Sequence, residues 1–239
     1  MGEPTMMKPG MTKQRVTRRE SGFTLVEIAI VLVIIGLLLG GILKGQELIT
    51  QARIRNVANE LVGIEAAVLA YQDRYRAMPG DDVGAGRWAS GTATMPGGDS
   101  NGQIGGHFNE AAAVTEPESR LFWAHLRQAG FLAGPTLASG SLAAAADQPR
   151  NALGGIIGVN YGGLGFTGNV LCTSNLPDKI AIAIDTQFDD GKGKTGSIRA
   201  WQGAVVPGQP IDAKGLAALA SGSDYQETGQ NVYLLCRSF

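Results

Sequence analysis

The chain has 239 residues, 44% of them hydrophobic, and a formal net charge of −1. This length suffices for one membrane-spanning element and one globular core, but not for two domains of full size. A nearly balanced charge produces no long-range field that attracts DNA or RNA, so we expect no nucleic-acid partner.

Residues 1–22 form a basic segment that meets an apolar run over residues 23–43. The basic segment carries five Lys or Arg side chains against two Glu, which predicts that it stays cytoplasmic and that the C-terminal bulk lies outside. The apolar run would span roughly 30 Å as a helix, the thickness of a bilayer core. We therefore expect one membrane-spanning helix.

Glu27 is the one charged residue in this apolar run. An ionised carboxylate costs about 2.5–3.5 kcal/mol at the membrane centre and normally has a partner, yet no cationic residue lies within helical reach inside the run. Cleavage between Gly22 and Phe23 would create an α-amino group one turn away, which a neighbouring subunit's glutamate could neutralise. An uncleaved signal anchor is the alternative, and it leaves Glu27 unexplained.

The string Ser21-Gly22-Phe23-Thr24-Leu25-Val26-Glu27, between the basic segment and the apolar run, resembles the processing site of type IV prepilins and of type II secretion pseudopilins. The resemblance implies that prepilin peptidase removes the leader after Gly22 and methylates Phe23. It implies that Glu27 pairs with the N-terminal amine of an adjacent subunit. The implied partners are copies of this chain, other pilins, the peptidase, an inner-membrane assembly platform and, before assembly, membrane lipid.

This resemblance implies a structural subunit of a type IV pilus-like filament, inserted in the inner membrane with a periplasmic C-terminal domain and later part of an extracellular pilus. A pseudopilin of a periplasmic pseudopilus, and an anchored surface-binding protein that never polymerises, remain alternatives. The large loop-rich domain favours a minor pilin or an adhesion-type subunit. We expect no enzyme and no cofactor, because the sequence has no HExxH, GxSxG or phosphate-binding glycine motif.

The helix is expected to continue through residues 44–78 as an amphipathic segment. Its apolar positions are spaced alternately by three and four: Ile54, Val57, Leu61, Ile64, Val68, Tyr71 and Tyr75. Pro79 and Gly80 then end it. Four glycines between residues 36 and 45 (Gly36, Gly40, Gly41 and Gly45) have two readings, local melting during assembly or close helix packing, and both stay open.

Residues 79–150 are expected to form a loop-rich connection with a short helix near 116–129, introduced by a capping box from Thr115 to Glu118. His125 in this helix and the isolated His107 are interpreted as packed or surface residues. Residues 151–239 are predicted to be rich in β-strands, at 155–161, 168–173, 197–201 and 231–236. Residues 177–188 have both helical and alternating periodicity, with helix suggested.

The family resemblance implies an α+β fold, in which the long N-terminal helix has a protruding transmembrane half and an amphipathic half that packs on a small antiparallel β-sheet, with a loop-rich insertion. Cys172 and Cys236 would face an oxidising compartment and can form a disulfide, with free buried thiols as the alternative. Asp185, Asp189 and Asp190 either form a turn after a helix, the favoured reading, or hold calcium as in some pseudopilins. We predict no metal site.

Overall fold

The computed structural model describes residues 2, 22–112, 116–205 and 224–239. The predictions for the basic leader and for Thr115 therefore lie outside the described residues. The chain divides into two compact units, Met1–Gln46 and Glu47–Phe239.

Helix α1 covers Leu25–Tyr75, a stretch of 51 residues. No proline interrupts this stretch, so each backbone N–H can bond the carbonyl four residues earlier. Arg76 ends the helix with a left-handed backbone (φ 55°), while its N–H still donates to the Gln72 carbonyl at 2.8 Å. The predicted end before Pro79 is confirmed.

The buried side of α1 in the unit Glu47–Phe239 matches the predicted apolar stripe. Val57, Leu61, Ile64, Val68 and Tyr71 are buried in the main hydrophobic core, and Ile54 and Tyr75 pack against it. Because these positions recur every three or four residues, they lie on one face of the helix. Core packing thus begins about eight helical turns after the start of α1.

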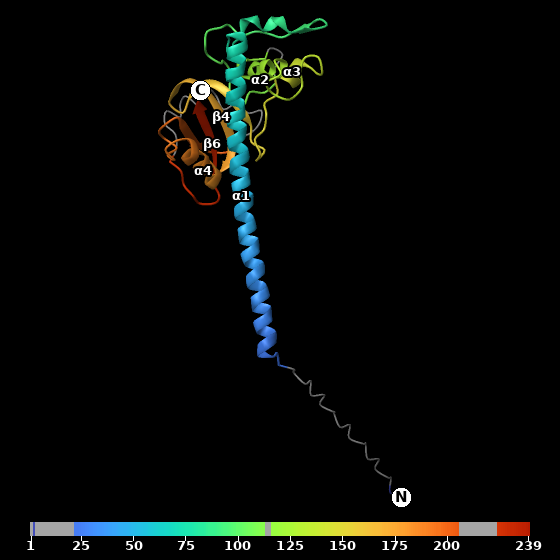
Figure 1. Ribbon diagram of the computed structural model, residues 1–239, viewed down its shortest axis with the longest axis vertical. Coiled ribbons are helices and arrows are strands. Elements are labelled where there is room, and N and C mark those ends of the chain that lie inside the picture. Colours follow the sequence, from blue (N-terminus) through green and yellow to red (C-terminus); the bar gives the residue numbers. More distant parts are fainter. Residues whose placement is uncertain (1, 3–21, 113–115, 206–223) are drawn as a thin grey trace. The chain divides into compact units, whose positions relative to one another are not determined.

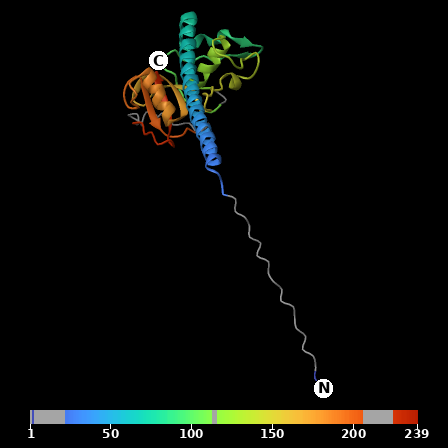
Figure 2. The ribbon, with the colours of Figure 1, turned by 60° about the horizontal axis from the view of Figure 1, so that its bottom comes forward.

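A four-stranded antiparallel sheet provides the other side of this core. Its strands are β3 (Ile157–Gly163), β4 (Phe166–Pro177), β5 (Ile198–Gln202) and β6 (Val232–Ser238), in the order β3-β4-β6-β5. Helix α4 (Asp178–Phe188) follows β4 directly, so the helical reading of residues 177–188 is confirmed. Figures 1 and 2 show the sheet and α4 on one side of α1, with the segment containing α2 and α3 on the other.

Alternate residues of the central strands face opposite sides of the sheet. On β6, Tyr233 and Leu235 belong to the core shared with α1, whereas Leu234 and Cys236 belong to a second cluster around Phe108. This period of two is the one expected for a strand buried on both faces. The α+β fold, with a long helix packed on a small antiparallel sheet, is confirmed.

The connection between α1 and β3 contains only short elements. They are η1 (Val83–Arg87), β1 (Ala89–Ser90), β2 (Ala93–Thr94), α2 (Glu118–Gln128) and α3 (Leu142–Ala145). The capping box predicted for α2 depends on Thr115, which lies outside the described residues; the N-cap position is Pro117, and no side chain caps it. The Glu118 carboxylate instead accepts from the backbone N–H groups of Asp99 (3.1 Å) and Gly105 (2.8 Å).

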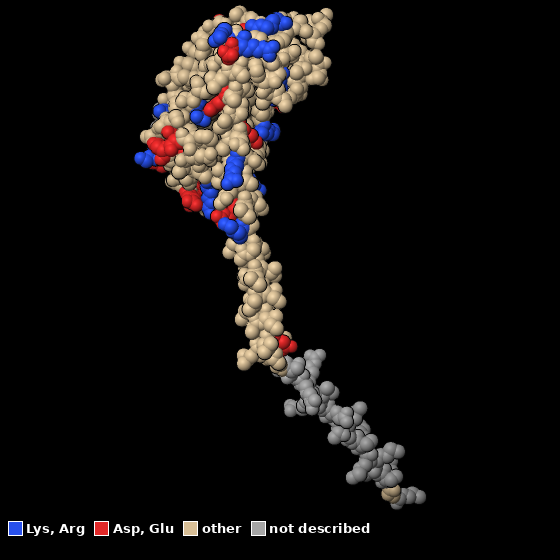
Figure 3. Space-filling model, viewed as in Figure 1, with Lys and Arg blue, Asp and Glu red and all other residues tan. Residues whose placement is uncertain are grey.

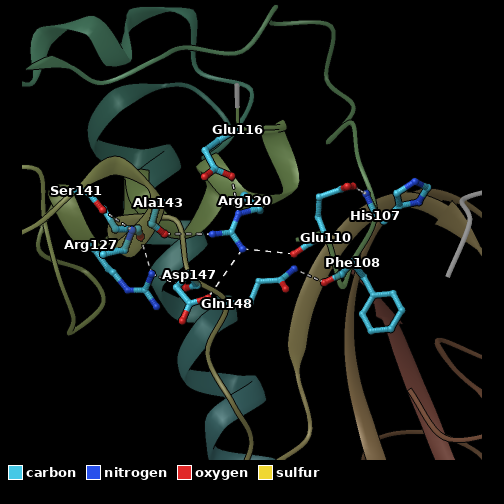
Figure 4. Close-up of polar contacts among 12 residues, drawn as sticks. His107, Phe108, Glu110, Glu116, Arg120, Arg127, Ser141, Ala143, Asp147 and Gln148 are labelled. Atoms are coloured by element: carbon cyan, nitrogen blue, oxygen red, sulfur yellow. Dashed lines mark hydrogen bonds and ion pairs between the residues drawn. The ribbon is translucent and has the colours of Figure 1, made fainter. Parts of the chain in front are cut away.

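Two arginines of α2 hold different parts of this connection to one another (Figure 4). Arg120 is buried, pairs with Glu116, and donates to the carbonyls of Glu110 and Ala143. Arg127 donates to the carbonyls of Ala145 and Asp147. Buried guanidinium groups need several acceptors, and here backbone carbonyls of the loops supply most of them. The loop-rich segment is therefore held by specific polar contacts as well as by its apolar core.

Candidate functional site

The predicted cleavage site lies just before α1. Gly22, Phe23 and Thr24 have no regular secondary structure, and all three are exposed. Phe23 leaves 83% of its surface accessible. A peptidase needs an accessible backbone at the bond that it cuts, and both residues of the Gly22–Phe23 bond are exposed.

Glu27 occupies the third position of α1 and interacts with the residue that precedes the helix. Its carboxylate accepts from the backbone N–H of Thr24 at 2.8 Å and from the Thr24 hydroxyl at 2.9 Å. In return, the Glu27 N–H donates to the Thr24 hydroxyl at 3.3 Å. This reciprocal pattern is a capping box, which satisfies N–H groups that the first turn of a helix leaves without partners.

This local role of Glu27 was not predicted, although Thr24 and Glu27 have the Ser/Thr-x-x-Glu spacing that defines the motif. Hydrogen bonds to Thr24 orient the carboxylate but do not neutralise its charge. Among the ion pairs of the described residues, none includes Glu27. In a membrane or a dry helix bundle the charge would still require a cation.

The surface around this site is apolar. Large hydrophobic residues from Phe23 to Leu43 are between 46% and 91% exposed. Within the described residues, α1 is the one helix long and apolar enough to cross a membrane, with a mean hydropathy of 2.8 over an 18-residue window of which nothing is buried. Figure 3 shows this stretch without basic groups and with a single acidic group near its start. So large an apolar surface needs lipid or protein to cover it.

Cys172 and Cys236 form a disulfide, as the sequence analysis predicted. They lie directly opposite each other on β4 and β6, and both are buried. The bond therefore joins the two central strands of the sheet. The alternative of free thiols is wrong.

The three aspartates proposed as a turn or a calcium site lie close together at the C-terminal end of α4. Asp185 accepts from the Gly191 N–H (3.1 Å) and from the Tyr225 hydroxyl, and Asp189 accepts from the Ile198 N–H (2.8 Å). Burial raises the pKa of the Asp185 carboxyl above its usual range, while the bond from Tyr225 opposes that rise. These contacts are the ones that a helix end followed by a turn requires.

A second carboxylate group, formed by Asp81, Asp99 and Glu118, was missed because its members are far apart in sequence. The Asp81 carboxylate accepts from the N–H groups of Asn101 (3.2 Å) and Gly102 (2.7 Å). Burial raises the pKa of the Glu118 carboxyl, and its two backbone donors oppose this. This group thus serves mainly as a set of acceptors for loop N–H groups.

His125 is fully buried and held on both ring nitrogens. Its Nδ1 accepts from the Gly80 N–H at 2.9 Å, so Nε2 carries the proton and donates to the Pro96 carbonyl at 2.9 Å. Burial lowers the pKa of His125 to about 4. A neutral imidazole committed to two backbone groups is a packed histidine, as the sequence analysis favoured.

Residues 17–43 match the family model of the prokaryotic N-terminal methylation motif. No curated protein and no solved structure matches the chain. The motif together with the long apolar N-terminal helix fits a type IV pilin-like or pseudopilin-like protein, a class of structural proteins with a membrane-anchoring helix.

Proposed function

We propose that this protein is a subunit of a type IV pilus-like filament, a pilin or minor pilin. Prepilin peptidase cuts the chain after Gly22 and methylates Phe23, and the subunits then assemble by packing their N-terminal helices. The observation that carries the proposal is the methylation motif over residues 17–43, joined to a helix whose apolar residues are largely exposed.

In this proposal, Glu27 has different partners before and after assembly. In the single chain its carboxylate bonds to Thr24. In the filament it also meets the positive N-terminal amine of a neighbouring copy, which balances its charge and sets the axial position of one helix against the next. Misaligned helices would leave a charge unpaired in an apolar interior, which is costly.

The location follows from the same proposal. The leader stays in the cytoplasm, α1 crosses the inner membrane, and the unit Glu47–Phe239 lies in the periplasm until an assembly platform moves the subunit into the filament. The disulfide between Cys172 and Cys236 supports an oxidising compartment for this unit.

The sheet edges favour assembly through helices over assembly by strand addition. On the outer edge of β3, the N–H groups of Ile157 and Tyr161 donate to the carbonyls of Pro149 and Ile104, both at 2.9 Å. On the outer edge of β5, the Ala200 N–H donates to the Gly193 carbonyl at 2.8 Å. Edges already bonded to the protein's own loops are poor templates for a strand from another chain.

The loop-rich connection between α1 and β3 favours a pilin or minor pilin over a secretion pseudopilin. About eighty residues separate these two elements and contain only short helices and strands. Surface loops of this size commonly carry binding functions. A subunit that only forms the core of a secretion pseudopilus needs fewer such loops.

N-terminal sequencing and mass analysis of the protein from cells with a prepilin peptidase test the proposal. We expect a chain that begins with N-methylated Phe23 and lacks residues 1–22. A Gly22→Trp variant, which changes only the last leader residue, should remain uncleaved. A wild-type chain that keeps its leader would contradict the proposal and favour the alternative, an anchored surface-binding protein that does not polymerise.

Electron microscopy of sheared surface material tests polymerisation, because an anchored monomer produces no filaments.

A further inference from the structure

A pocket of about 350 Å³ lies among the loops that connect α1 to β3. Its lining includes Glu110, Arg120, Asp147, Gln148, Arg150 and Ile156. Figure 4 shows Asp147 and Gln148 next to the guanidinium group of Arg120. Ligand pockets commonly have volumes of about 300–1,000 Å³, so this one can hold a small molecule.

Two polar side chains of this pocket are buried and fixed in place. Arg120 is 3% exposed, and its guanidinium group is bound to the Glu116 carboxylate and to two loop carbonyls. Gln148 is 9% exposed, and its Nε2 donates to the Phe108 carbonyl. Side chains that are already held in one position lose little conformational freedom when a ligand binds, which favours binding.

The same pocket has hydrogen-bonding groups that the chain leaves unused. No described residue donates to Oε1 of Gln148, although this side chain is nearly buried. The Asp147 carboxylate accepts no hydrogen bond from the described residues and lies 3.9 Å from the Arg120 guanidinium. Nη1 of Arg150 donates to the Gly154 carbonyl at 3.0 Å, which leaves its other N–H groups for a ligand. The pocket therefore offers both acceptors and donors.

The charges in and behind the pocket balance. Four charged side chains line it, two of each sign. Glu116 pairs with Arg120 and adds a negative charge. Arg127 donates to the Asp147 carbonyl and adds a positive one. An ionic ligand would therefore lose its hydration without meeting an excess of opposite charge.

A neutral ligand with several hydroxyl groups matches this arrangement. Each hydroxyl can donate to a carboxylate or amide oxygen and can accept from a guanidinium group. Ile156, Ala111 and Ala112 add an apolar wall, against which the C–H groups of a sugar ring can pack. We propose that this pocket binds a neutral saccharide of one or two rings. The inference goes beyond the proposed filament, because the whole pocket lies within a single chain.

Binding of the full-length, detergent-solubilised chain to a glycan array tests this inference. The array carries neutral glycans that end in glucose, galactose, mannose or N-acetylglucosamine, together with sialylated forms of the galactose-terminated glycans. The detergent must lack a sugar headgroup, because an alkyl maltoside would itself compete for the pocket. We expect binding to at least one neutral terminal sugar, and the free methyl glycoside of that sugar should compete for it.

Asp147→Ala and Arg150→Ala test whether the sugar lies in this pocket. Each removes a charged group that makes at most one hydrogen bond within the described chain, so the disulfide and the resistance to protease should be retained. We expect each variant to bind at least about tenfold more weakly, because hydrogen bonds to charged groups are strong. Asp73→Ala and Arg74→Ala make the same changes at exposed positions of α1 and should bind as the wild type does.

A pocket-filling substitution keeps the test decisive if either variant loses its disulfide. Ala111→Trp occupies the pocket without removing a polar side chain, and it should also abolish binding. Ala93→Trp, at an exposed position of β2, is its matched control and should bind normally.

The other outcomes overturn the inference. Binding to no glycan, or to sialylated glycans alone, would exclude a neutral saccharide as the ligand. Equal binding by the wild type and the pocket variants would show that the sugar lies elsewhere. None of these results affects the filament proposal, which N-terminal sequencing and electron microscopy test separately.

Discussion

The Glu27 carboxylate has two separable properties, hydrogen-bond acceptance and negative charge. The capping box with Thr24 uses the first, and the proposed pairing with a neighbour's N-terminal amine uses the second. Glutamine serves in a capping box as glutamate does, but it carries no charge. Substitution by glutamine therefore separates the two roles.

We expect Glu27→Gln to leave the subunit stable and cleaved, because the cap is retained, but to reduce filament yield at least about tenfold. Glu27→Ala should be stable, processed and unassembled as well. The yield is measured as sheared filament protein against total subunit. Thr24→Val removes only the hydroxyl of the cap and serves as the matched control with a smaller effect. Wild-type filament levels from Glu27→Gln would show that assembly depends on the helix cap and not on the negative charge of Glu27.

His125 should make the stability of the unit Glu47–Phe239 depend on pH. Burial lowers its pKa in the folded protein to about 4, against about 6.5 in the unfolded chain. The unfolded state therefore binds the proton more readily, and stability is complete above pH 6.5 and is lost as the pH falls toward 4. The loss amounts to roughly 3 kcal/mol over this range, at about 1.4 kcal/mol per pKa unit.

The measurement compares denaturant unfolding of the wild type and of His125→Gln between pH 7 and pH 4.5. We expect the difference between the two proteins to shrink as the pH falls, because only the wild type carries this histidine. A constant difference between wild type and His125→Gln would contradict the assignment of a buried neutral imidazole.

At the scale of the element, the two readings of the glycines of α1, local melting during assembly and close helix packing, lead to different expectations. The helix is continuous through Gly36, Gly40, Gly41 and Gly45, and a methyl group built on any of them meets no atom within 4 Å. No steric contact within the described part of the chain therefore requires glycine at these positions. Close packing against another helix would require it.

We expect Gly36→Ala to assemble and Gly36→Leu to lose filaments. Alanine removes the helix-weakening effect of glycine, about 1 kcal/mol, yet it remains small enough for close packing. If glycine were needed because it lets the helix melt locally during assembly, both substitutions would make the helix harder to melt and would impair assembly equally. Filament yield of the two variants, with membrane insertion as the control, distinguishes these cases.

Helices and strands with strong periodicity were predictable from sequence, and their ends less so. The buried stripe of α1 and the alternation of β6 follow from spacings of 3.6 and 2 residues, which are local properties. The start of α2 was not predictable in this way. Glu118 has the right spacing for a capping box, but distant loop N–H groups of Asp99 and Gly105 bind its carboxylate in the folded chain.

At the scale of the whole molecule, the disulfide stabilises a unit rich in loops. Cys172 and Cys236 are 64 residues apart in sequence and close a loop that restricts the unfolded chain. The chain-entropy model gives about 4 kcal/mol for a loop of this length. This is a large part of the stability of an ordinary domain.

We expect the Cys172→Ser, Cys236→Ser double variant to lose about this free energy of unfolding, measured by urea titration of the detergent-solubilised chain. The wild type in the presence of a reductant is the control and should match the double variant. Equal stability of the oxidised and reduced wild type would show that the core alone holds the sheet together.

The sequence by itself determined the apolar helix and the processing motif, because each depends on residues adjacent or regularly spaced along the chain. The α+β class was implied by the family resemblance that this motif carries. Only the tertiary structure decided the packed state of His125 and the gathering of Asp81, Asp99 and Glu118. These features depend on which distant segments of the chain contact each other. The packing of the core decides those contacts, and the spacing of residues along the chain does not reveal them. The capping box at Glu27 is local and was readable, but its partner Thr24 becomes evident only when the helix is seen to begin at Leu25.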